Sequence, residues 1–243
     1  MENVMNIVAN DIDYKLLNDR IREKGKTITV KNCLGQRFIA AGMNGKNITI
    51  EGIPGNALGA YLNGANITVQ GNAQDATGDT MNEGKIVIHG NIGDAAGYAM
   101  RGGSIFVKGD AGYRAGIHMK AYKEKVPSLI IGGKAGSFLG EYQAGGTIIV
   151  LGLDSEDDDI IGNYACTGMH GGKMFIRSKC KGVHFPHQVT AKKATLKDLA
   201  EIEEYIVEFC KLFGYNKKDV MNSDFTVVIP DSKNPYQQMY VAN

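Results

Sequence analysis

A glycine-marked repeat runs along most of the 243-residue chain and limits what the chain can fold into. The stretch from Gly90 to Gly109 reads GNIGDAAGYAMRGGSIFVKG, and its inner glycines Gly93 and Gly97 follow the first by three and seven positions. Neighbouring segments repeat this spacing, which indicates an architecture rather than one ligand-binding loop. The anchor glycines lie 19, 19, 19, 24 and 19 residues apart; they are Gly52, Gly71, Gly90, Gly109, Gly133 and Gly152. The other repeat glycines are Gly93, Gly97, Gly112, Gly116, Gly136 and Gly140.

A short strand-like run follows each glycine loop, with apolar residues two apart, as in Ile86 and Ile88. That period is typical of a strand with one face turned inward. No helical stretch separates the runs, whereas a βαβ array needs a crossover that is usually a helix. We therefore expect an all-β fold, a single-stranded right-handed parallel β-helix of about seven coils, because crossovers between parallel strands are almost always right-handed.

Equivalent positions of stacked coils should form columns through the core. The first expected column comprises Ile48, Ile67, Ile86, Ile105, Leu129, Ile148 and Met174. The second comprises Leu62, Met81, Met100, Met119, Gln143 and Met169. Glycine suits the corners because it takes positive φ without steric cost and lets the adjacent coil approach closely. A dinucleotide-binding loop would instead occur once, between a strand and a helix.

The two ends differ from the repeats and predict appendages. We expect an N-terminal helical cap over 1–26, the β-helix over 27–180, and a C-terminal helix with an extended tail over 181–243. Residues 11–24 place apolar side chains near one helical face, and Gly25 follows as a stop. In the second helical pattern Thr195 is the expected N-cap and Asp198 follows three residues later, like a capping box. The tail DFTVVIPDSKNPYQQMYVAN should lie on the solenoid's flank or on a partner.

Composition excludes several function classes. A formal net charge of +1 gives no broad reason to expect nucleic acid or an anionic membrane as partner. The sequence has neither a signal-type N-terminus nor a run of eighteen apolar residues, so we expect a soluble, cytoplasmic protein. The four cysteines form no CxxC pair, which argues against an iron–sulfur or structural zinc site in this chain; they are Cys33, Cys166, Cys180 and Cys210.

Candidate chemistry is sparse. His184 and His187 have a spacing that could serve a metal, but Pro186 between them favours a surface turn. The acidic run from Ser155 to Asp159 lacks the ligand spacing of a calcium loop. His118 and His170 each neighbour a core methionine and are expected to have a corner or packing role.

Some parallel β-helices cleave polysaccharides with carboxylates gathered on one outward face. Asp75, Asp94, Asp110 and Arg114 lie near the repeat corners, but the acids share no pairing pattern. We therefore predict no catalytic, cofactor-binding or metal-binding residue. The five-residue expansion AYKEKVP before Ser128 predicts a bulged corner, and such insertions often form the binding surface of a solenoid.

The repeat GxxGxxxGxxMxxG with its short strand, together with TGMHGGKMFIR, resembles the glycine-repeat (GXGXG) domain that closes the large subunit of glutamate synthase. The likeness covers about 28–177, and the flanks resemble a stand-alone form of that domain. In that family the domain is a right-handed β-helix without catalytic residues, packed against the amidotransferase and the FMN and iron–sulfur synthase domains. The resemblance implies a non-catalytic structural subunit of a divided glutamate synthase. Its expected partners are a glutaminase-type chain and a synthase chain that carries FMN and the iron–sulfur cluster, with no cofactor in this chain.

Very similar repeats occur in the C subunit of formylmethanofuran dehydrogenase, and the repeats alone do not separate the two families. The C-terminal helix and the ending NPYQQMYVAN favour the glutamate synthase type. A carbohydrate-active β-helix enzyme is the third hypothesis, and self-association of the chain is left open.

Overall fold

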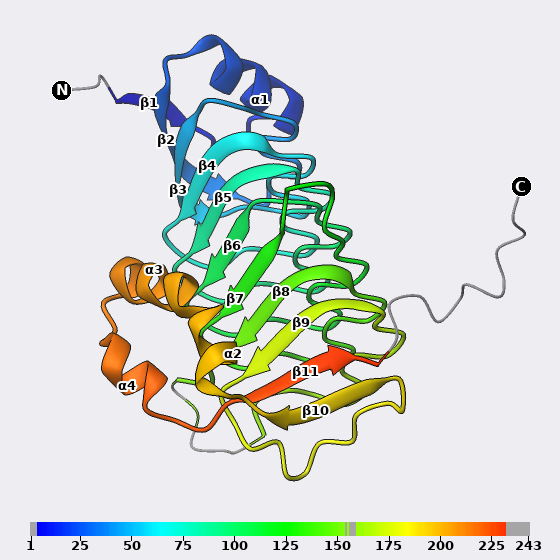
Figure 1. Ribbon diagram of the computed structural model, residues 1–243. Coiled ribbons are helices and arrows are strands. Elements are labelled where there is room, and N and C mark those ends of the chain that lie inside the picture. Colours follow the sequence, from blue (N-terminus) through cyan, green and yellow to red (C-terminus); the bar gives the residue numbers. More distant parts are fainter. Residues whose placement is uncertain (1–3, 154, 156–158, 232–243) are drawn as a thin grey trace, which may run out of the picture.

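The computed structural model describes residues 4–153, 155 and 159–231. Figure 1 shows one tall column of stacked strands, with a helical segment at its N-terminal end and further helical segments beside the strands of its lower half. The parallel strands are β1 (Met5–Val8), β2 (Thr27–Leu34), β3 (Asn47–Ile53), β4 (Asn63–Val69), β5 (Glu83–Ile88), β6 (Ser104–Val107), β7 (Ser128–Ile131), β8 (Ala144–Val150) and β9 (Gly171–Ile176). The remaining elements are α1 (Tyr14–Glu23), β10 (Val189–Lys193), α2 (Leu196–Ala200), α3 (Glu203–Phe213), α4 (Lys217–Met221) and β11 (Thr226–Pro230).

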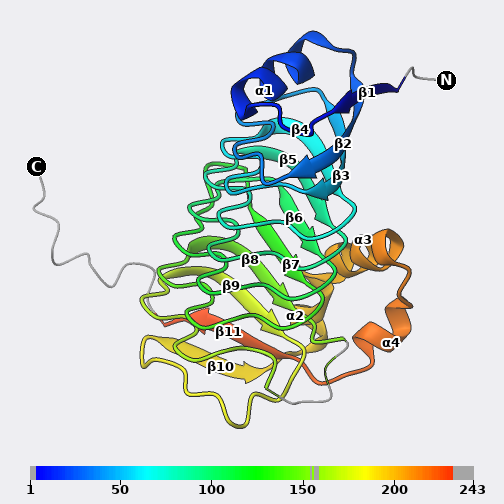
Figure 2. The ribbon, with the colours of Figure 1, turned by 180° about the vertical axis from the view of Figure 1, so that it is seen from behind.

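Strands β1 to β9 pair in chain order, and β11 and β10 complete an 11-stranded sheet. The chain is thus a right-handed parallel β-helix of about eight turns, where the sequence predicted about seven. Figure 2 shows the opposite side, where the connecting loops of successive coils stack. The strand register confirms the first predicted column, because Ile86 pairs with Ile67 on one side and with Ile105 on the other.

The second predicted column is buried as well, from Leu62 to Met169. Gln143 takes the place of a methionine there and is fully buried. Its Nε2 donates to the backbone carbonyls of Gly145 and Gly146, at 3.2 and 3.1 Å. The Gln143 amide therefore supplies a hydrogen-bond donor to these two backbone carbonyls, which a methionine side chain could not do.

The corners between the loops and the strands have an alternating backbone. Arg114, Gly116 and His118 have φ values of 57°, 70° and 55°. The N–H groups of Arg114 and His118 donate to the following coil, while that of Gly116 donates to the preceding one, at 2.8–2.9 Å. Left-handed conformations at the corners are therefore adopted both by glycines and by residues that carry side chains. Hydrogen bonds to both neighbouring coils hold these side-chain-bearing residues in a region of φ that they rarely adopt alone.

A second hydrophobic core lies outside the coil, under α3. Along one column the outward residues change from threonine in β2–β4 to apolar side chains in β6–β9; the latter are Phe106, Ile130, Ile149 and Phe175. Ile202, Ile206 and Phe209 pack on them, and Lys85 of β5 forms an ion pair with Glu208 of α3. The C-terminal helix is thus bound to the flank of the solenoid, as Figure 1 shows.

Both ends of the solenoid are covered. At the first coil, α1 buries Leu17 and Ile21, and β1 adds a strand that the sequence analysis did not predict. At the last coil, β11 pairs antiparallel with β9 and β10. The residues of the predicted tail from 232 onward lie outside the described residues. The predicted domain boundaries at 26/27 and 180/181 remain a prediction. Strands β1 and β11 lie outside these boundaries in the sequence, and both join the same sheet as the repeats.

The predicted helix signals are present in the C-terminal segment. Asp198 N donates to Thr195 Oγ1 at 3.2 Å and Thr195 N donates to Asp198 Oδ2 at 2.8 Å, which completes a capping box. The Thr195 hydroxyl and the Thr195 backbone N–H both donate to Asp198 Oδ2 and hold the pKa of the Asp198 carboxyl below its ordinary value. Gly214, with φ 78°, ends α3. Within the described parts of the chain, every helix falls short of the length and apolar character needed to cross a membrane.

Candidate functional site

The repeat glycines hold the coils together in two different ways. Gly90 and Gly109 lie outside the left-handed region, so their backbone would accept another residue. A Cβ at these positions would, however, approach Asn72 Oδ1 to 2.2 Å and Asn91 Oδ1 to 2.0 Å. These glycines are required because an Asn side chain of the preceding coil occupies the space, together with the backbone of Gly71 and Asn72 in the case of Gly90. The same close approach, to a side chain or to the backbone of a preceding coil, holds for Gly93, Gly112, Gly133 and Gly136.

The other repeat glycines, except Gly71, have positive φ, and all of these except Gly97 also have a close contact. Gly116 has φ 70°, and a Cβ there would lie 2.4 Å from Ile148 Cδ1 in the core column. Gly140 and Gly97 belong to the same column of the repeat, and Gly52 and Gly152 also have positive φ. Gly71 is different, since a Cβ there would lie 3.6 Å from Gly52 O, an ordinary contact.

Asn and Asp side chains form ladders between the coils. Asn91 N donates to Asn72 Oδ1 at 2.8 Å, and one coil later Asp110 N donates to Asn91 Oδ1 at 2.9 Å. Lys134 N continues this ladder by donating to Asp110 Oδ1 at 2.7 Å. A second ladder runs through Asp75 and Asp94, whose Oδ1 atoms accept from Asp94 N and Tyr113 N.

The corner acids that a carbohydrate-active enzyme would need are therefore engaged in structure. Asp75, Asp94 and Asp110 each accept a backbone N–H of the next coil. Arg114 forms an ion pair with Glu141 at 3.2 Å and lies over the Phe138 ring, 4.9 Å from its centroid. Each acid thus accepts a backbone N–H in a ladder between coils. Glycoside hydrolysis instead requires two carboxyl groups that flank the bond to be cleaved.

Among the described residues, the histidines and Asp159 belong to no gathering of metal ligands. Across the described ranges, no three His, Cys, Asp or Glu side chains lie close enough together to hold a metal ion. His184 and Asp159 line an open hollow of about 340 Å³ at the last coil. Residues 156–158 of the acidic run lie outside the described residues. His170 lies beside the corner, with Nδ1 2.9 Å from Gly168 O.

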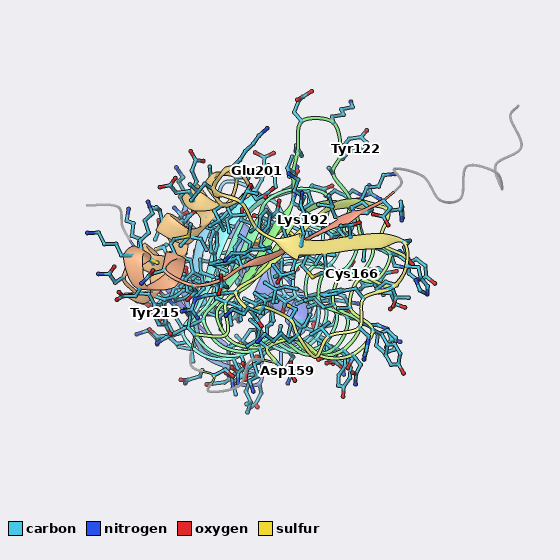
Figure 3. The ribbon with its side chains drawn as sticks, turned by 60° about the horizontal axis from the view of Figure 1, so that its bottom comes forward. Tyr122, Asp159, Cys166, Lys192, Glu201 and Tyr215 are labelled. Atoms are coloured by element: carbon cyan, nitrogen blue, oxygen red, sulfur yellow. The ribbon has the colours of Figure 1, made fainter. Side chains whose placement is uncertain are left out.

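All four cysteines are free and buried. Burial raises the pKa of the Cys166 thiol to about 12 and that of Cys33 to about 11. Figure 3 places Cys166 inside the coil, with Tyr122 and Asp159 on opposite sides of it. Protonated, buried thiols are poor nucleophiles and poor metal ligands.

The sequence analysis missed a surface feature that we call the aromatic edge, formed by Tyr98, His118 and Tyr142. These side chains come from three successive coils and are exposed. The His118 ring stacks on Tyr142 with centroids 5.2 Å apart and meets the Tyr98 ring edge-on at 5.9 Å. Their signal was present as aromatic residues eight or nine positions after an anchor glycine, but our columns followed only the inward positions.

Comparison with known proteins shows to which family this β-helix belongs. The family model described as the GXGXG motif matches residues 2–232. The chain belongs to the GXGXG family. A protein of Methanocaldococcus jannaschii with the name "Uncharacterized protein MJ1350" is 47% identical over 254 residues, which cover 99% of this chain and 97% of that protein.

A solved structure shares the fold of this GXGXG protein. It is a chain of the formyltransferase/hydrolase complex (FhcABCD) from Methylorubrum extorquens, determined in complex with methylofuran. The TM-score is 0.64 at 17% identity, and the match covers 92% of this chain and 93% of that one. At this identity the likeness shows the fold, and it shows that this fold occurs in a chain of a multi-subunit complex.

Proposed function

We propose that this chain is a structural subunit that positions the catalytic chains of a multi-subunit enzyme. The observation that carries the proposal is the use of the polar corner residues: their side chains bond the backbone of the next coil and so build a rigid column. Both ends of that column are covered, by α1 and by the pair of β11 and β10. A closed rigid body of this kind is suited to fixing the distance between partners.

Two kinds of assembly are candidates. A complex of the formyltransferase/hydrolase type, related to formylmethanofuran chemistry, is supported by the fold shared over nearly the whole chain with a member of FhcABCD. A divided glutamate synthase is supported by the sequence resemblance and by the C-terminal helical segment. In that segment Thr195 caps α2, and α3 packs on the solenoid. In either case the cofactors belong to partner chains. We propose that the complex is cytoplasmic.

The test is a mild affinity purification of the tagged chain from its own cells, with mass spectrometry of the proteins that co-elute. Recovery of a formyltransferase or hydrolase, or of a molybdenum or tungsten pterin enzyme, would support the first assembly. Recovery of a glutaminase-type chain with an FMN and iron–sulfur synthase chain would support the second. Recovery of no catalytic chain would overturn the proposal.

The isolated chain supplies a second test. We expect a colourless protein without turnover of glutamine and 2-oxoglutarate. A bound flavin spectrum, or turnover by the chain alone, would contradict the structural role. Cleavage of polysaccharides by the pure chain would instead support the carbohydrate-active hypothesis, which the engaged corner acids disfavour.

A further inference from the structure

Two of the three rings of the aromatic edge stack on each other. His118 and Tyr142 lie 8° from parallel with centroids 5.2 Å apart, close to the spacing of neighbouring strands. One face of each ring therefore lies against the other ring, and the rims of both rings remain at the surface. Tyr98 and Tyr142 still expose 39% and 38% of their surface. The rim of an aromatic ring carries partial positive charge, so these edges favour acceptor groups.

Two cations run beside the aromatic edge. Arg101 follows the buried Met100 and Lys120 follows the buried Met119, and both side chains are exposed. Arg101 lies three residues after Tyr98, and Lys120 lies two residues after His118. Lys120 N donates to Met100 O at 3.0 Å, which places the two residues on adjacent coils. Both side chains are exposed, and neither forms an ion pair within the described residues. The chain as a whole has a net charge of +1, so these two neighbouring cations without ion-pair partners form a local excess of positive charge.

The insertion 121–127 stands next to these cations. It contains the five extra residues that lengthen one repeat from 19 to 24 residues. Tyr122 and Lys125 exchange two backbone hydrogen bonds of 3.0 Å, so the loop has a defined turn. Figure 1 shows it rising above the regular coils before β7, and Figure 3 shows Tyr122 projecting from the coil. Tyr122 and Val126 are 53% and 52% exposed.

We infer that this surface, the aromatic edge with Arg101, Lys120 and the loop 121–127, docks a polypeptide of a partner chain through that partner's carboxylates. The inference rests on the proposed function and names the face that it uses. Within the surface, Glu83 is bound by Lys125 and Glu141 by Arg114, while Glu124 lies on the outer turn of the loop. Arg101 and Lys120 remain to meet acidic groups from outside.

The geometry favours protein over other partners. Single-stranded nucleic acid stacks its bases on open ring faces, whereas His118 and Tyr142 cover each other. Tyrosine and arginine are enriched among the residues that dominate binding energy at protein interfaces. The opposite flank of the strands is already covered by α3.

Charge reversal tests the surface without disturbing the core. The full-length tagged chain carrying Arg101→Glu and Lys120→Glu is purified from its own cells beside the wild type. A matched control reverses Arg20 and Lys26, an exposed arginine and lysine at the N-terminal end. We expect the first variant to lose the catalytic chains by about tenfold or more, because the reversed side chains would place like charges opposite the partner's carboxylates. The control variant should retain them, and both variants should keep the wild-type melting temperature.

Zero-length carbodiimide cross-linking of the wild-type complex identifies the partner's groups. We expect Lys120 to join an Asp or Glu of a captured catalytic chain. If the wild type captures catalytic chains but the charge-reversed variant captures them equally, the docking surface is wrong while the proposed function stands. Cross-links confined to lysines of other faces would lead to the same conclusion. If the wild type captures no catalytic chain, the proposed function itself fails.

Discussion

At the residue scale, the fold depends on pairs formed between one coil and the next. An Asn or Asp side chain bonds a backbone N–H of the following coil, and a glycine beside that N–H leaves room for the side chain. Asn72 and Gly90 form such a pair, and Asn91 and Gly109 form the next. A glycine of this kind is needed because a side-chain oxygen of the preceding coil lies against it. Other repeat glycines are needed because their φ is positive.

Replacing Gly90 by alanine should therefore be costly, whereas replacing Gly71 should not. The new Cβ at Gly90 would lie 2.2 Å from Asn72 Oδ1, while that at Gly71 meets only Gly52 O at 3.6 Å. We expect Gly90→Ala to lower the free energy of unfolding by about 1–3 kcal/mol. Gly71→Ala should be neutral or slightly stabilising. Urea denaturation of both variants measures the difference.

The pair can be checked further with Asn72→Ala in the Gly90→Ala background. Removing the Asn72 side chain relieves the shortest contact, while Gly71 C and Asn72 N stay 2.8 and 2.9 Å from the new Cβ. The double variant should therefore recover part of the loss and be more stable than the sum of the single losses predicts. Additive losses would show that Asn72 is not what makes a glycine necessary at this position.

The buried thiols supply a prediction about pH. Ordinary thiols ionise near pH 9, but burial raises the pKa of Cys166 to about 12 and of Cys33 to about 11. Because the folded pKa values are raised, the thiols' contribution to stability is present below pH 9 and is lost as the pH rises toward the folded values. The native protein should react slowly with DTNB at pH 8 and fully in denaturant. Rapid reaction of Cys33 or Cys166 in the native protein would contradict this.

At the element scale, α3 packs across the outward face of strands β6–β9. Phe209 is fully buried on the outward apolar column, and its ring contacts Phe213 and Tyr215 at 4.8 and 5.7 Å between centroids. Val207 on the same helix is 46% exposed. The helix therefore offers a large buried anchor and an exposed apolar control within one turn.

We expect Phe209→Ala to cost about 3–5 kcal/mol at this interface, and Val207→Ala to cost little. Coils in a solenoid contact only their neighbours, so the loss should be local. Hydrogen exchange resolved along the chain should show faster exchange in 203–213 and little change in β2–β4. Equal acceleration throughout the sheet would mean that α3 does not unfold as a separate unit.

The same elements show what the sequence could and could not predict. Inward columns such as Ile86 with Ile105, and the cap of Thr195 with Asp198, follow from local spacing and were found. The docking of α3 was missed, although the change from Thr68 to Phe106 on the outward face carried its signal. The aromatic edge and the Asn and Asp ladders join residues of different coils, so they required the register between coils. The strand β1 is too short for periodicity to show it.

At the scale of the whole molecule, a solenoid must prevent its ends from pairing with other chains. At the C-terminal end the outermost strand β10 carries Lys192 and Lys193, and exposed lysines on an edge strand oppose further pairing. At the N-terminal end the edge strand β1 spans only four residues and α1 covers the first coil. The N-terminal end therefore relies on packing rather than charge.

Displacing α1 should turn the N-terminal end into a site of association. Leu17 is fully buried against the first coil, whereas its neighbour Leu16 is 47% exposed. An unpaired lysine at the buried position would carry a large desolvation cost, so Leu17→Lys should release the helix from the core. We expect size-exclusion chromatography with light scattering to show concentration-dependent growth in mass for Leu17→Lys. Leu16→Lys should keep the wild-type mass. If Leu17→Lys releases α1, seen as rapid hydrogen exchange in 14–23, and the mass is unchanged, then β1 alone protects this end.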